Sequence, residues 1–402
     1  MSSANRPKRD EKLKMEILNL PTCAVLRVTP PQGGHEQINS ELDLREPVEL
    51  GNFSLIGDRN YVHDTRKMAY LIEPPQDQRL DWDLNEAFDD RIPKNHSLSE
   101  KLDNLLRWIC DNVEKFRAPC DGENSKLSGL HTDFVSYRGL LTTIMCSVYE
   151  QKENWILGVT LYKGSRYLCQ YSTLEQIERE KNKSGWFERV AAWGYKFEQY
   201  MTASRPGGRP TPQEPINEKE EFCSVVRTRL GQRHSLVYGA EVDGVDDRLV
   251  AKYPEYKHST RRYVEFKTSR FVETSRQRKN MARFKMVKWW AQCYLIGIPR
   301  VICGYRTDDG IVEQVKSYRL SELHDEGREF WSPLRMFHFL DKFLDFIKTN
   351  VTVDDPKEVV IFEFVPEQQI INCMTLPKDH ADYNRYVILP EWYLVKLGEH
   401  LD

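Results

Sequence analysis

The sequence predicts an α/β (α+β) protein built as one large domain, and three observations support this prediction. Segments with helical periodicity alternate along the chain with short runs of β-branched and aromatic residues that are typical of strands. The 402 residues can bury one large core or two smaller ones, and we favour a single domain over 21–402 after a disordered tail over 1–20. A hydrophobic fraction of 40% and an aromatic fraction of 11% are those of an ordinary soluble globule.

The composition argues against several classes of protein. A formal net charge of -3 does not fit a generally basic protein that coats nucleic acid, so any polyanion site must be a local patch. Nine cysteines occur singly, without a C-x-x-C pair or zinc-binding spacing, which favours reduced thiols inside the cell. We find no signal peptide and no apolar run long enough to cross a bilayer. We expect a nuclear address, with the cytoplasm as a second compartment; the basic residues at 6–9 are a weak import signal.

The first predicted elements come before the charged motifs. A helix is expected to begin at Ser97, where Ser97 and Glu100 form a capping box. Its apolar stripe consists of Leu102, Leu105, Leu106, Ile109, Val113 and Phe116. Runs of β-branched and apolar residues at 139–146 and 155–162 predict two strands joined as a hairpin. Helical periodicity over 186–201 predicts the next helix.

Two carboxylate motifs follow, each at a predicted strand. Strand-like runs lead into Glu241 and Asp243, and into Glu265 and Lys267. Because side chains alternate along a strand, Glu241 and Asp243 share one face, and so do Glu265 and Lys267. If the two strands are neighbours, three acids and one ammonium group meet. Acids packed so closely need a cation, and their hard oxygen ligands suit Mg²⁺ or Mn²⁺.

Glu198, on the predicted helix over 186–201, is the next candidate. Its carboxylate lies at the edge of an apolar stripe that includes Gly194 and Phe197. Glycine costs a helix about 1 kcal/mol relative to alanine, and space above the carboxylate for a metal or a phosphate is one reason to accept that cost. The alternative is a surface glutamate beside a glycine that lets two helices approach. The two strand motifs favour the first interpretation.

A basic segment follows the second motif. The periodicity over 274–295 predicts a helix with an apolar face: Phe284, Val287, Ala291 and Leu295. A different face carries Lys285, Lys288 and Gln292. Eleven cationic residues lie in this part of the chain: Lys257, Arg261, Arg262, Lys267, Arg270, Arg276, Arg278, Lys279, Arg283, Lys285 and Lys288. Next to the acids, this basic run favours an electropositive patch that holds a nucleic-acid backbone, although a solvated helix face is the usual fate of a charge run.

Six short motifs occur in an order that resembles the core of the PD-(D/E)XK nuclease superfamily. More narrowly, the chain resembles the DXO family of RNA 5′-end decapping enzymes and exoribonucleases. The motifs are Tyr137-Arg138-Gly139, Gly194-Tyr-Lys-Phe-Glu198, Glu241-Val-Asp243, Glu265-Phe-Lys267, Lys288-Trp-Trp-Ala-Gln292 and Gly304-Tyr-Arg306. The resemblance covers most of the chain. It implies a mixed central β-sheet flanked by helices, with a PD-(D/E)XK nuclease-like core.

The resemblance also implies a set of metal ligands. Glu198, Asp243 and Glu265 would bind a divalent metal directly, together with the backbone carbonyl of Phe266. Glu241 would bind through water or a second ion, and Glu198 would also border the substrate. We expect Mg²⁺ or Mn²⁺, two ions per site, to activate water for attack on phosphorus.

A second group of residues is implied to act on the RNA. Lys267 and Gln292 would contact the scissile phosphate or the attacking water, and Arg138 would hold an RNA phosphate or the 5′ end. Lys285 and Lys288 would bind the RNA backbone. Family members hydrolyse incomplete or unusual caps, including NAD caps, unmethylated caps and 5′ triphosphates, and several then degrade the RNA 5′ to 3′ in RNA quality control. We expect the 5′ end of single-stranded RNA as substrate, no membrane association and a monomer.

Three alternatives are weighed against this enzyme. The chain could be a catalytically weak relative that binds RNA ends, but every metal position of the family is filled. It could be a DNA-repair nuclease of the wider superfamily, which is favoured if the Arg138 and Gly304-Tyr-Arg306 matches are accidental. It could also stimulate a partner 5′–3′ exoribonuclease, as nuclear fungal relatives do, but a partner surface leaves no sharp trace in one sequence.

Overall fold

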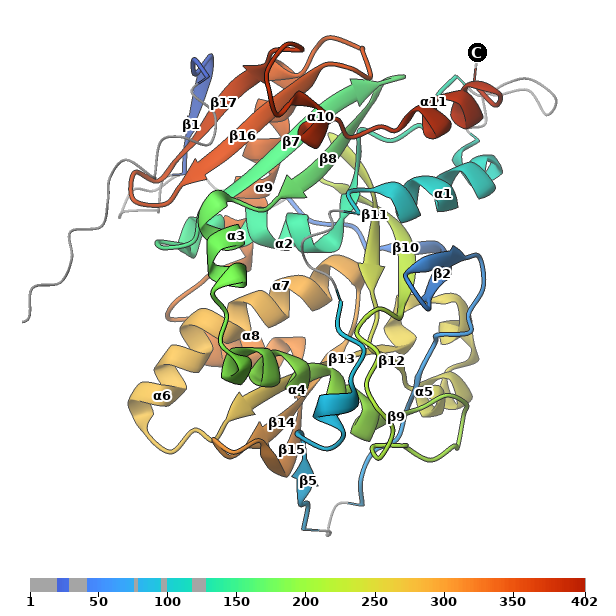
Figure 1. The fold of residues 1–402 in the computed structure, drawn as a ribbon, viewed down its shortest axis with the longest axis vertical. Helices are drawn as coiled ribbons and strands as arrows, with labels where there is room; N and C mark the ends of the chain where they lie inside the picture. Colours follow the sequence, from blue (N-terminus) through green and yellow to red (C-terminus); the bar gives the residue numbers. More distant parts are fainter. Residues whose placement is uncertain (1–19, 29–41, 76–78, 95–99, 118–127, 402) are drawn as a thin grey trace, which may run out of the picture.

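The computed structural model describes residues 20–28, 42–75, 79–94, 100–117 and 128–401. The predicted tail over 1–20, apart from Leu20, and the predicted helix start at Ser97 lie outside these residues. Figure 1 shows the chain folded into an upper and a lower part, each built around its own β-sheet. Among the described residues, no helix combines the length and the apolar character that a membrane span requires.

In the described part of the chain, the upper sheet has ten strands. In spatial order they are β1 (Ala24–Arg27), β17 (Ile370–Leu376), β16 (Val359–Val365), β7 (Trp155–Tyr162), β8 (Ser165–Tyr171), β6 (Phe134–Tyr137), β11 (His234–Glu241), β10 (Glu221–Leu230), β2 (Val48–Ile56) and β3 (Asn60–Val62). Strand β6 runs parallel to both β8 and β11, whereas the other pairs are antiparallel. The sheet is therefore mixed.

The lower part contains a sheet of seven strands. Their order is β5 (Trp82–Asp83), β15 (Ile311–Arg319), β14 (Arg300–Arg306), β13 (Tyr263–Arg270), β12 (Gly244–Val245), β4 (Tyr70–Leu71) and β9 (Thr202–Ala203). Strand β13 pairs parallel with β14 and antiparallel with β12.

Helices connect and cover these sheets. The α-helices are α1 (Asp103–Asp111), α2 (Arg138–Cys146), α3 (Leu174–Lys181), α4 (Gly185–Met201), α5 (Asp247–Lys252), α6 (Ser275–Asn280), α7 (Val287–Ile296), α8 (Leu320–Gly327), α9 (Pro333–Asn350), α10 (Tyr383–Tyr386) and α11 (Glu391–Gly398). A π-helix, η7 (Met281–Met286), joins α6 to α7. Short 3-10 segments are η2 (Phe88–Asp90), η3 (Val113–Phe116), η4 (Ser147–Tyr149), η5 (Pro254–His258) and η6 (Thr260–Arg262).

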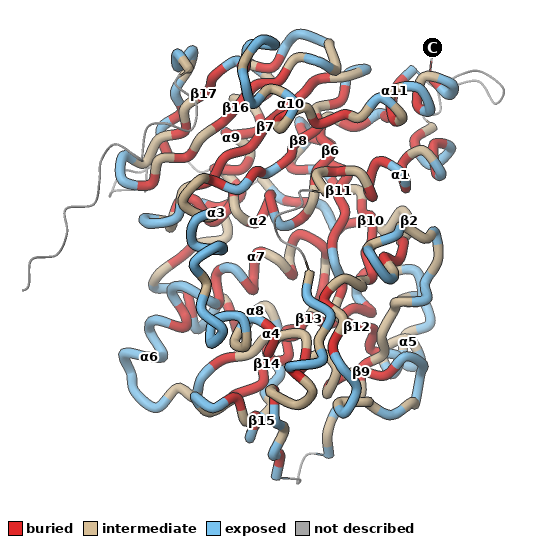
Figure 2. The backbone as a smooth tube through the Cα atoms, viewed as in Figure 1, coloured by how far each residue is buried: buried red, intermediate tan, exposed pale blue. Residues whose placement is uncertain are grey.

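The buried residues follow the two sheets and the helices that cover them (Figure 2). One apolar cluster packs α1 and α11 on one face of the ten-stranded sheet, and a second packs α2 and α9 on the other and extends to α7. A third cluster packs α4 against β13 and β14. The predicted α/β (α+β) class, with a mixed sheet flanked by helices, is confirmed.

The predicted strand over 139–146 is wrong, because these residues form helix α2. Leu140, Leu141, Ile144 and Met145 are all buried, and their spacing puts them on one helical face that meets α7 and α9. The predicted hairpin is wrong for the same reason. The strand over 155–162 is confirmed as β7, which pairs with β8 instead.

The predicted helix over 186–201 is confirmed as α4. The two remaining predicted helices differ somewhat from the structure. The first begins at Asp103, later than predicted, and its apolar stripe is buried as expected, although Val113 and Phe116 belong to η3. The helical stretch over 274–295 is confirmed as α6, η7 and α7, but Phe284 is 54% exposed rather than buried. A π-turn holds more residues than an α-turn, so it rotates Phe284 outward while Met281 and Met286 face the core.

Candidate active site

The site is built where the chain crosses from one sheet to the other. Strand β11 of the large sheet ends at Glu241, and β12 of the small sheet begins at Gly244. The two predicted motif strands, β11 and β13, therefore lie in different sheets, so the condition that they are neighbours is not met. Asp243 in the crossing segment reaches Glu265 because β12 pairs with β13, with Gly244 opposite Val264.

A hydrogen bond fixes the orientation of Asp243. The backbone N–H of Phe266 donates to Oδ2 of Asp243 over 2.7 Å. The Phe266 side chain points the other way and packs against Phe197, as the alternation of a strand requires. Burial, followed by the negative charge of Glu265, raises the pKa of Asp243 to about 7. Binding of a cation would relieve this electrostatic cost.

Glu265 lies between two cations. Its side chain is 1% exposed, and its Oε1 accepts from Nζ of Lys267 over 2.5 Å while its Oε2 accepts from Nη1 of Arg138 over 3.0 Å. Burial acts to raise the pKa of Glu265, but the charges of Lys267 and Arg138 prevail and lower it to about 2. The predicted pairing of Glu265 with Lys267 on one face is confirmed.

Arg138 lies deeper than a residue on an open RNA surface. It is the first residue of α2, it is 7% exposed, and its Nε makes no hydrogen bond with the described residues. The structure therefore places Arg138 against a candidate metal ligand. Its predicted contact with an RNA phosphate stays a prediction.

Helix α4 brings Glu198 to the site. Its residues Trp193, Phe197 and Met201 are fully buried, so Glu198 comes to the margin of the packed face and is itself half-buried. Burial, then the charges of Asp243 and Glu241, raise the pKa of Glu198 well above its ordinary value. The carboxylates of Glu198, Glu241, Asp243 and Glu265 thus act on one another, although they come from α4, β11, the crossing segment and β13.

The motif Gly304-Tyr-Arg306 packs against the same helix, α4. A Cβ at Gly304 would lie 2.5 Å from Cε2 of Phe197, so only a glycine lets α4 pack this closely on β14. The guanidinium of Arg306 stacks 4.2 Å from the ring centre of Trp193. Gly194, in contrast, has open space where its Cβ would be, with no described atom within 4 Å. The alternative that Gly194 allows two helices to approach is therefore wrong.

The remaining predicted site residues lie around this centre. The residue Glu241 is exposed overall, but the protein atoms around its carboxylate displace part of its hydration, and this desolvation, then the charge of Glu221, raises its pKa to about 8. Gln292 is half-buried on α7, next to Cys293, whose thiol pKa is raised by burial and then by the charge of Glu265. This turn of α7 therefore lies close to Glu265.

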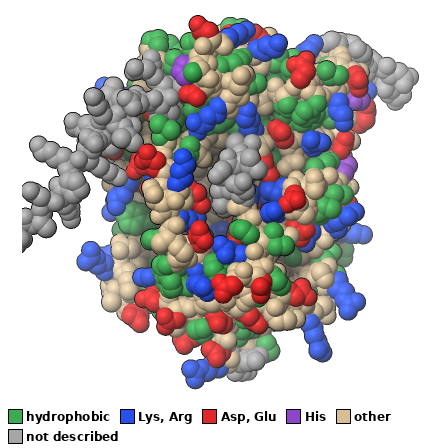
Figure 3. Space-filling view, in the orientation of Figure 1, with side chains coloured by type: hydrophobic (Ala, Val, Ile, Leu, Met, Phe, Trp, Pro, Cys, Tyr) green, Lys and Arg blue, Asp and Glu red, His purple; other side chains and the backbone are tan. Residues whose placement is uncertain are grey.

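The basic run of the sequence does not form one patch. Lys285 on η7 donates to Oγ of Ser269 over 3.0 Å, and Lys288 on α7 lies 3.5 Å from Glu150, so the two lysines contact different parts of the fold. Arg262, in contrast, is buried against Glu49 at 2.7 Å. Over the face of the molecule that Figure 3 draws, Lys and Arg side chains are interspersed with Asp and Glu.

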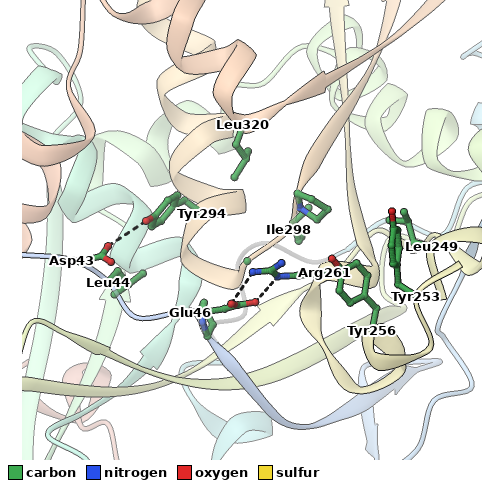
Figure 4. A pocket seen from close by; sticks show the side chains of 13 residues that line it. Asp43, Leu44, Glu46, Leu249, Tyr253, Tyr256, Arg261, Tyr294, Ile298 and Leu320 are labelled. Carbon is green, nitrogen blue, oxygen red and sulfur yellow. Dashed lines mark hydrogen bonds and ion pairs between the residues drawn. The ribbon is translucent and has the colours of Figure 1, made fainter.

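Arg261 contributes to a different hollow. A pocket of about 580 Å³ is lined by Asp43, Glu46, Tyr253, Tyr256, Arg261 and Tyr294 together with apolar side chains. Figure 4 shows Arg261 paired with Glu46 at 2.5 Å, and Tyr294 directed to Asp43 at 3.4 Å. None of the predicted metal ligands lines this pocket, so we do not assign the reaction to it.

The structure adds residues that the sequence did not indicate. Arg59 holds Glu221 with two hydrogen bonds of 2.9 and 3.0 Å, and Nζ of Lys94 lies 3.7 Å from Glu221. The charges of Glu221 and Lys94 both act on Glu241. Tyr195 is also close, because the charges of Glu241 and Glu198 add to burial in raising its pKa. Arg59, Lys94 and Glu221 are far apart in the sequence and form no motif, so only the fold could reveal them, whereas Tyr195 belongs to the motif Gly194-Tyr-Lys-Phe-Glu198.

The donor set fits a divalent metal. Four carboxylates and a nearby main-chain carbonyl offer the hard oxygen atoms that Mg²⁺ and Mn²⁺ prefer. Burial and then the neighbouring acids raise the pKa values of Glu198 and Asp243, an electrostatic cost that a bound cation would relieve. No three of these carboxylates, within the described ranges, have oxygen atoms within 4.8 Å of one another. Lys267 and Arg138 instead compensate Glu265, so we expect a bound ion to draw the acids together.

Comparison with known proteins gives one family. Residues 45–394 match the model of the RAI1-like PD-(D/E)XK nucleases. The chain is 33% identical over 362 residues to the mouse decapping and exoribonuclease protein, covering 89% of this chain and 86% of the mouse protein. It is 30% identical over 355 residues to the Drosophila melanogaster decapping and exoribonuclease protein Rai1, covering 87% and 91%.

Solved structures of proteins named Rai1 have the same fold. Candida albicans Rai1, in complex with pU5-Mn²⁺, superposes with a TM-score of 0.77 at 20% identity, covering 94% of this chain and 99% of that one. The Scheffersomyces stipitis Rai1 structure gives a TM-score of 0.75 at 21% identity, covering 90% and 99%. At this identity the likeness concerns the fold alone.

Proposed function

Because this chain belongs to the RAI1-like PD-(D/E)XK nuclease family, we propose that it is a metal-dependent hydrolase of RNA 5′ ends. It would remove incomplete or unusual caps, namely NAD caps, unmethylated caps and 5′ triphosphates, and degrade the RNA from 5′ to 3′. One observation carries the proposal: Glu198 from α4, Asp243 from the segment between the two sheets and Glu265 from β13 act on one another next to Lys267. The wider alternative of a DNA-repair nuclease loses support, since relatives at 33% identity are named for decapping.

The side chains of the site divide the work. Mg²⁺ or Mn²⁺ bound by Glu198, Asp243 and Glu265 would supply activated water and neutralise phosphate charge, with two ions as the proposed number. Arg138 keeps Glu265 ionised and fixed from the buried side. Lys267 carries a positive charge at the rim, where it can stabilise the charge that develops on phosphorus oxygens once a metal competes for Glu265.

Other residues would hold the RNA. Lys285 and Lys288 lie on the helical segment that follows β13 and are placed to contact phosphates beyond the scissile one. Gln292, one helical turn beyond Lys288, would orient the phosphate or the water. A monomeric state, a nuclear address with the cytoplasm as second compartment, and an exoribonuclease partner complete the proposal.

The test measures products from four RNAs that differ only at the 5′ end: NAD cap, unmethylated cap, triphosphate and monophosphate. Each is incubated with Mg²⁺ or Mn²⁺ and with the wild type or with Asp243→Asn plus Glu265→Gln. We expect the wild type to release end groups or nucleotides and the double variant to lose this activity. Glu46→Gln, which removes a carboxylate from the separate pocket, serves as the matched control and should retain it.

Two results would count against the proposal in different ways. If the wild type binds RNA ends but hydrolyses none of the four, the chain is an RNA-end binder and the enzyme assignment fails. If the double variant is as active as the wild type, the reaction occurs elsewhere and the site assignment fails.

A further inference from the structure

A second cluster of metal-binding side chains lies at the far end of β11. His234 is the first residue of that strand, whereas Glu241 at the candidate active site is the last. Asp341 and Asp345 lie one turn apart on α9, on the face that meets His234. The cluster therefore joins a helix to the strand that supports the active site, and it shares no residue with that site.

One donor atom from each of the three side chains lies within 4.8 Å of the other two. Nε2 of His234 lies 3.3 Å from Oδ1 of Asp341 and 3.3 Å from Oδ1 of Asp345. The His234 side chain is fully buried, and neither of its ring nitrogens makes a hydrogen bond with the described residues; Oδ1 of Asp341 makes none either. Buried polar atoms of this kind are costly to leave unsatisfied, so the geometry calls for another ligand of these atoms.

The spacing fits a tetrahedral metal ion. Zn²⁺ binds imidazole nitrogen and carboxylate oxygen at about 2.0–2.2 Å, which places the ligands of a tetrahedron about 3.3–3.5 Å apart. A salt bridge would look different, because an imidazolium N–H aims at one oxygen and approaches it to about 2.7–2.9 Å. Nε2 of His234 instead lies at the same distance, 3.3 Å, from one oxygen of each carboxylate. We infer that His234, Asp341 and Asp345 bind a divalent transition metal, with Zn²⁺ as the best match.

Arg233 is placed to orient the two carboxylates. Its Nη2 lies 2.5 Å from Oδ2 of Asp341 and 2.6 Å from Oδ2 of Asp345. Each aspartate thus gives one oxygen to the guanidinium and turns the other toward His234. Outer partners that hold metal ligands in this way are typical of metal sites. Asp345 is 42% exposed, so solvent can supply a fourth ligand.

The ion would have a structural role. The mixed nitrogen and oxygen set favours Zn²⁺ over the Mg²⁺ expected at the all-oxygen active site, so the two sites would take different metals. A metal here would fasten α9 to β11 across more than a hundred residues of sequence. Because the inference uses no residue of the nuclease site, it stands whether or not the proposed function holds.

The experiment uses the full-length chain carrying Asp243→Asn plus Glu265→Gln, so that the active-site acids do not compete for the probe. Zn²⁺ is titrated in excess Mg²⁺, and Co²⁺ is used as a spectroscopic substitute. We expect one Zn²⁺ per chain, a visible Co²⁺ absorption band typical of a tetrahedral site, and a rise in melting temperature with Zn²⁺. Adding Asp345→Asn should weaken Zn²⁺ binding at least about 100-fold, more than an outer partner would.

Asp133→Asn is the matched control, since it removes a carboxylate of the same region that is outside the cluster: its oxygens contact Lys348 at 3.0 Å and the backbone N–H of Ser235 at 2.8 Å. It should leave Zn²⁺ affinity unchanged. Asp345 is partly exposed, so its variant should fold, and His234→Gln provides a second test. If the parent binds no Zn²⁺, or if Asp345→Asn binds it as tightly as the parent, the cluster is an ion pair without metal and the inference is wrong.

Discussion

The packing of Gly304 against Phe197 provides a sharp test of how α4 positions Glu198. In Gly304→Ala, the new Cβ would lie 2.5, 2.8 and 2.9 Å from Cε2, Cζ and Cδ2 of Phe197. Carbon atoms need about 3.5–4.0 Å, so the ring must recede by roughly 1 Å. All three atoms belong to one rigid ring that is fully buried, so no flexible chain end can give way.

Two effects should follow in Gly304→Ala. Overpacking of a tight core costs about 1–3 kcal/mol, which urea unfolding measures. Because Glu198 is the next residue after Phe197, the same shift displaces its carboxylate, and a misplacement of about 1 Å can lower turnover about 100-fold. We therefore expect a folded protein whose kcat for release of the 5′ end falls by about one to two orders of magnitude.

The control is Gly185→Ala, in the first turn of the same helix, where a Cβ would meet no described atom within 4 Å. It should leave kcat unchanged. The double variant Gly304→Ala plus Phe197→Leu removes the ring edge and should recover part of the activity. Full activity in Gly304→Ala, with a normal unfolding curve, would refute the argument that this contact sets the position of Glu198.

Three further predictions concern the charges of the site. Arg138→Met should destabilise the fold by about 3–5 kcal/mol in urea unfolding, because it leaves the buried carboxylate of Glu265 with one partner fewer. A destabilisation of less than about 1 kcal/mol, which is roughly the value of an exposed ion pair, would contradict the buried pairing. Lys285→Ala plus Lys288→Ala should weaken RNA binding and reduce the slope of log affinity against log salt by about 1.4 for single-stranded RNA, and an unchanged slope would show that neither lysine contacts phosphate. In EDTA the melting temperature should fall as pH rises from about 4 to 7, because the unfolded chain ionises near 4 whereas Asp243 does so at about 7 in the fold. Mg²⁺ should remove most of this decline, and Asp243→Asn should flatten it; identical curves with and without Asp243 would show that this carboxylate does not titrate abnormally.

Strong periodicity made part of the fold predictable. Helix α4 follows from its helical periodicity, and strands β7, β11 and β13 follow from runs of β-branched and apolar residues. The strand prediction for residues 139–146 was wrong because a short apolar run fits a strand or a buried helix equally well. The predicted burial of Phe284 was wrong because the π-turn of η7 changes the rotation per residue. No local sequence signal marks such a turn.

The sequence predicted which residues belong to the candidate site better than it predicted how they are arranged in space. Glu265 and Lys267 share a face because they are two residues apart on one strand. The relation of Asp243 to Glu265 depends on a two-residue crossing between sheets, which alternation alone does not reveal. Contacts such as Arg138 with Glu265 join residues 127 positions apart. The same limit applies to His234 and α9, whose metal-type donors form no recognisable spacing in the sequence.

The most direct test of the central claim is a crystal structure of this protein soaked in Mn²⁺, with anomalous scattering used to locate the ion. We predict manganese bound by carboxylate oxygens of Glu198, Asp243 and Glu265 at metal–oxygen distances of about 2.0–2.2 Å, close to those of small divalent ions. We also predict that Nζ of Lys267 moves away from Oε1 of Glu265. Well-ordered carboxylates that remain apart, with manganese absent from among them, would contradict the account.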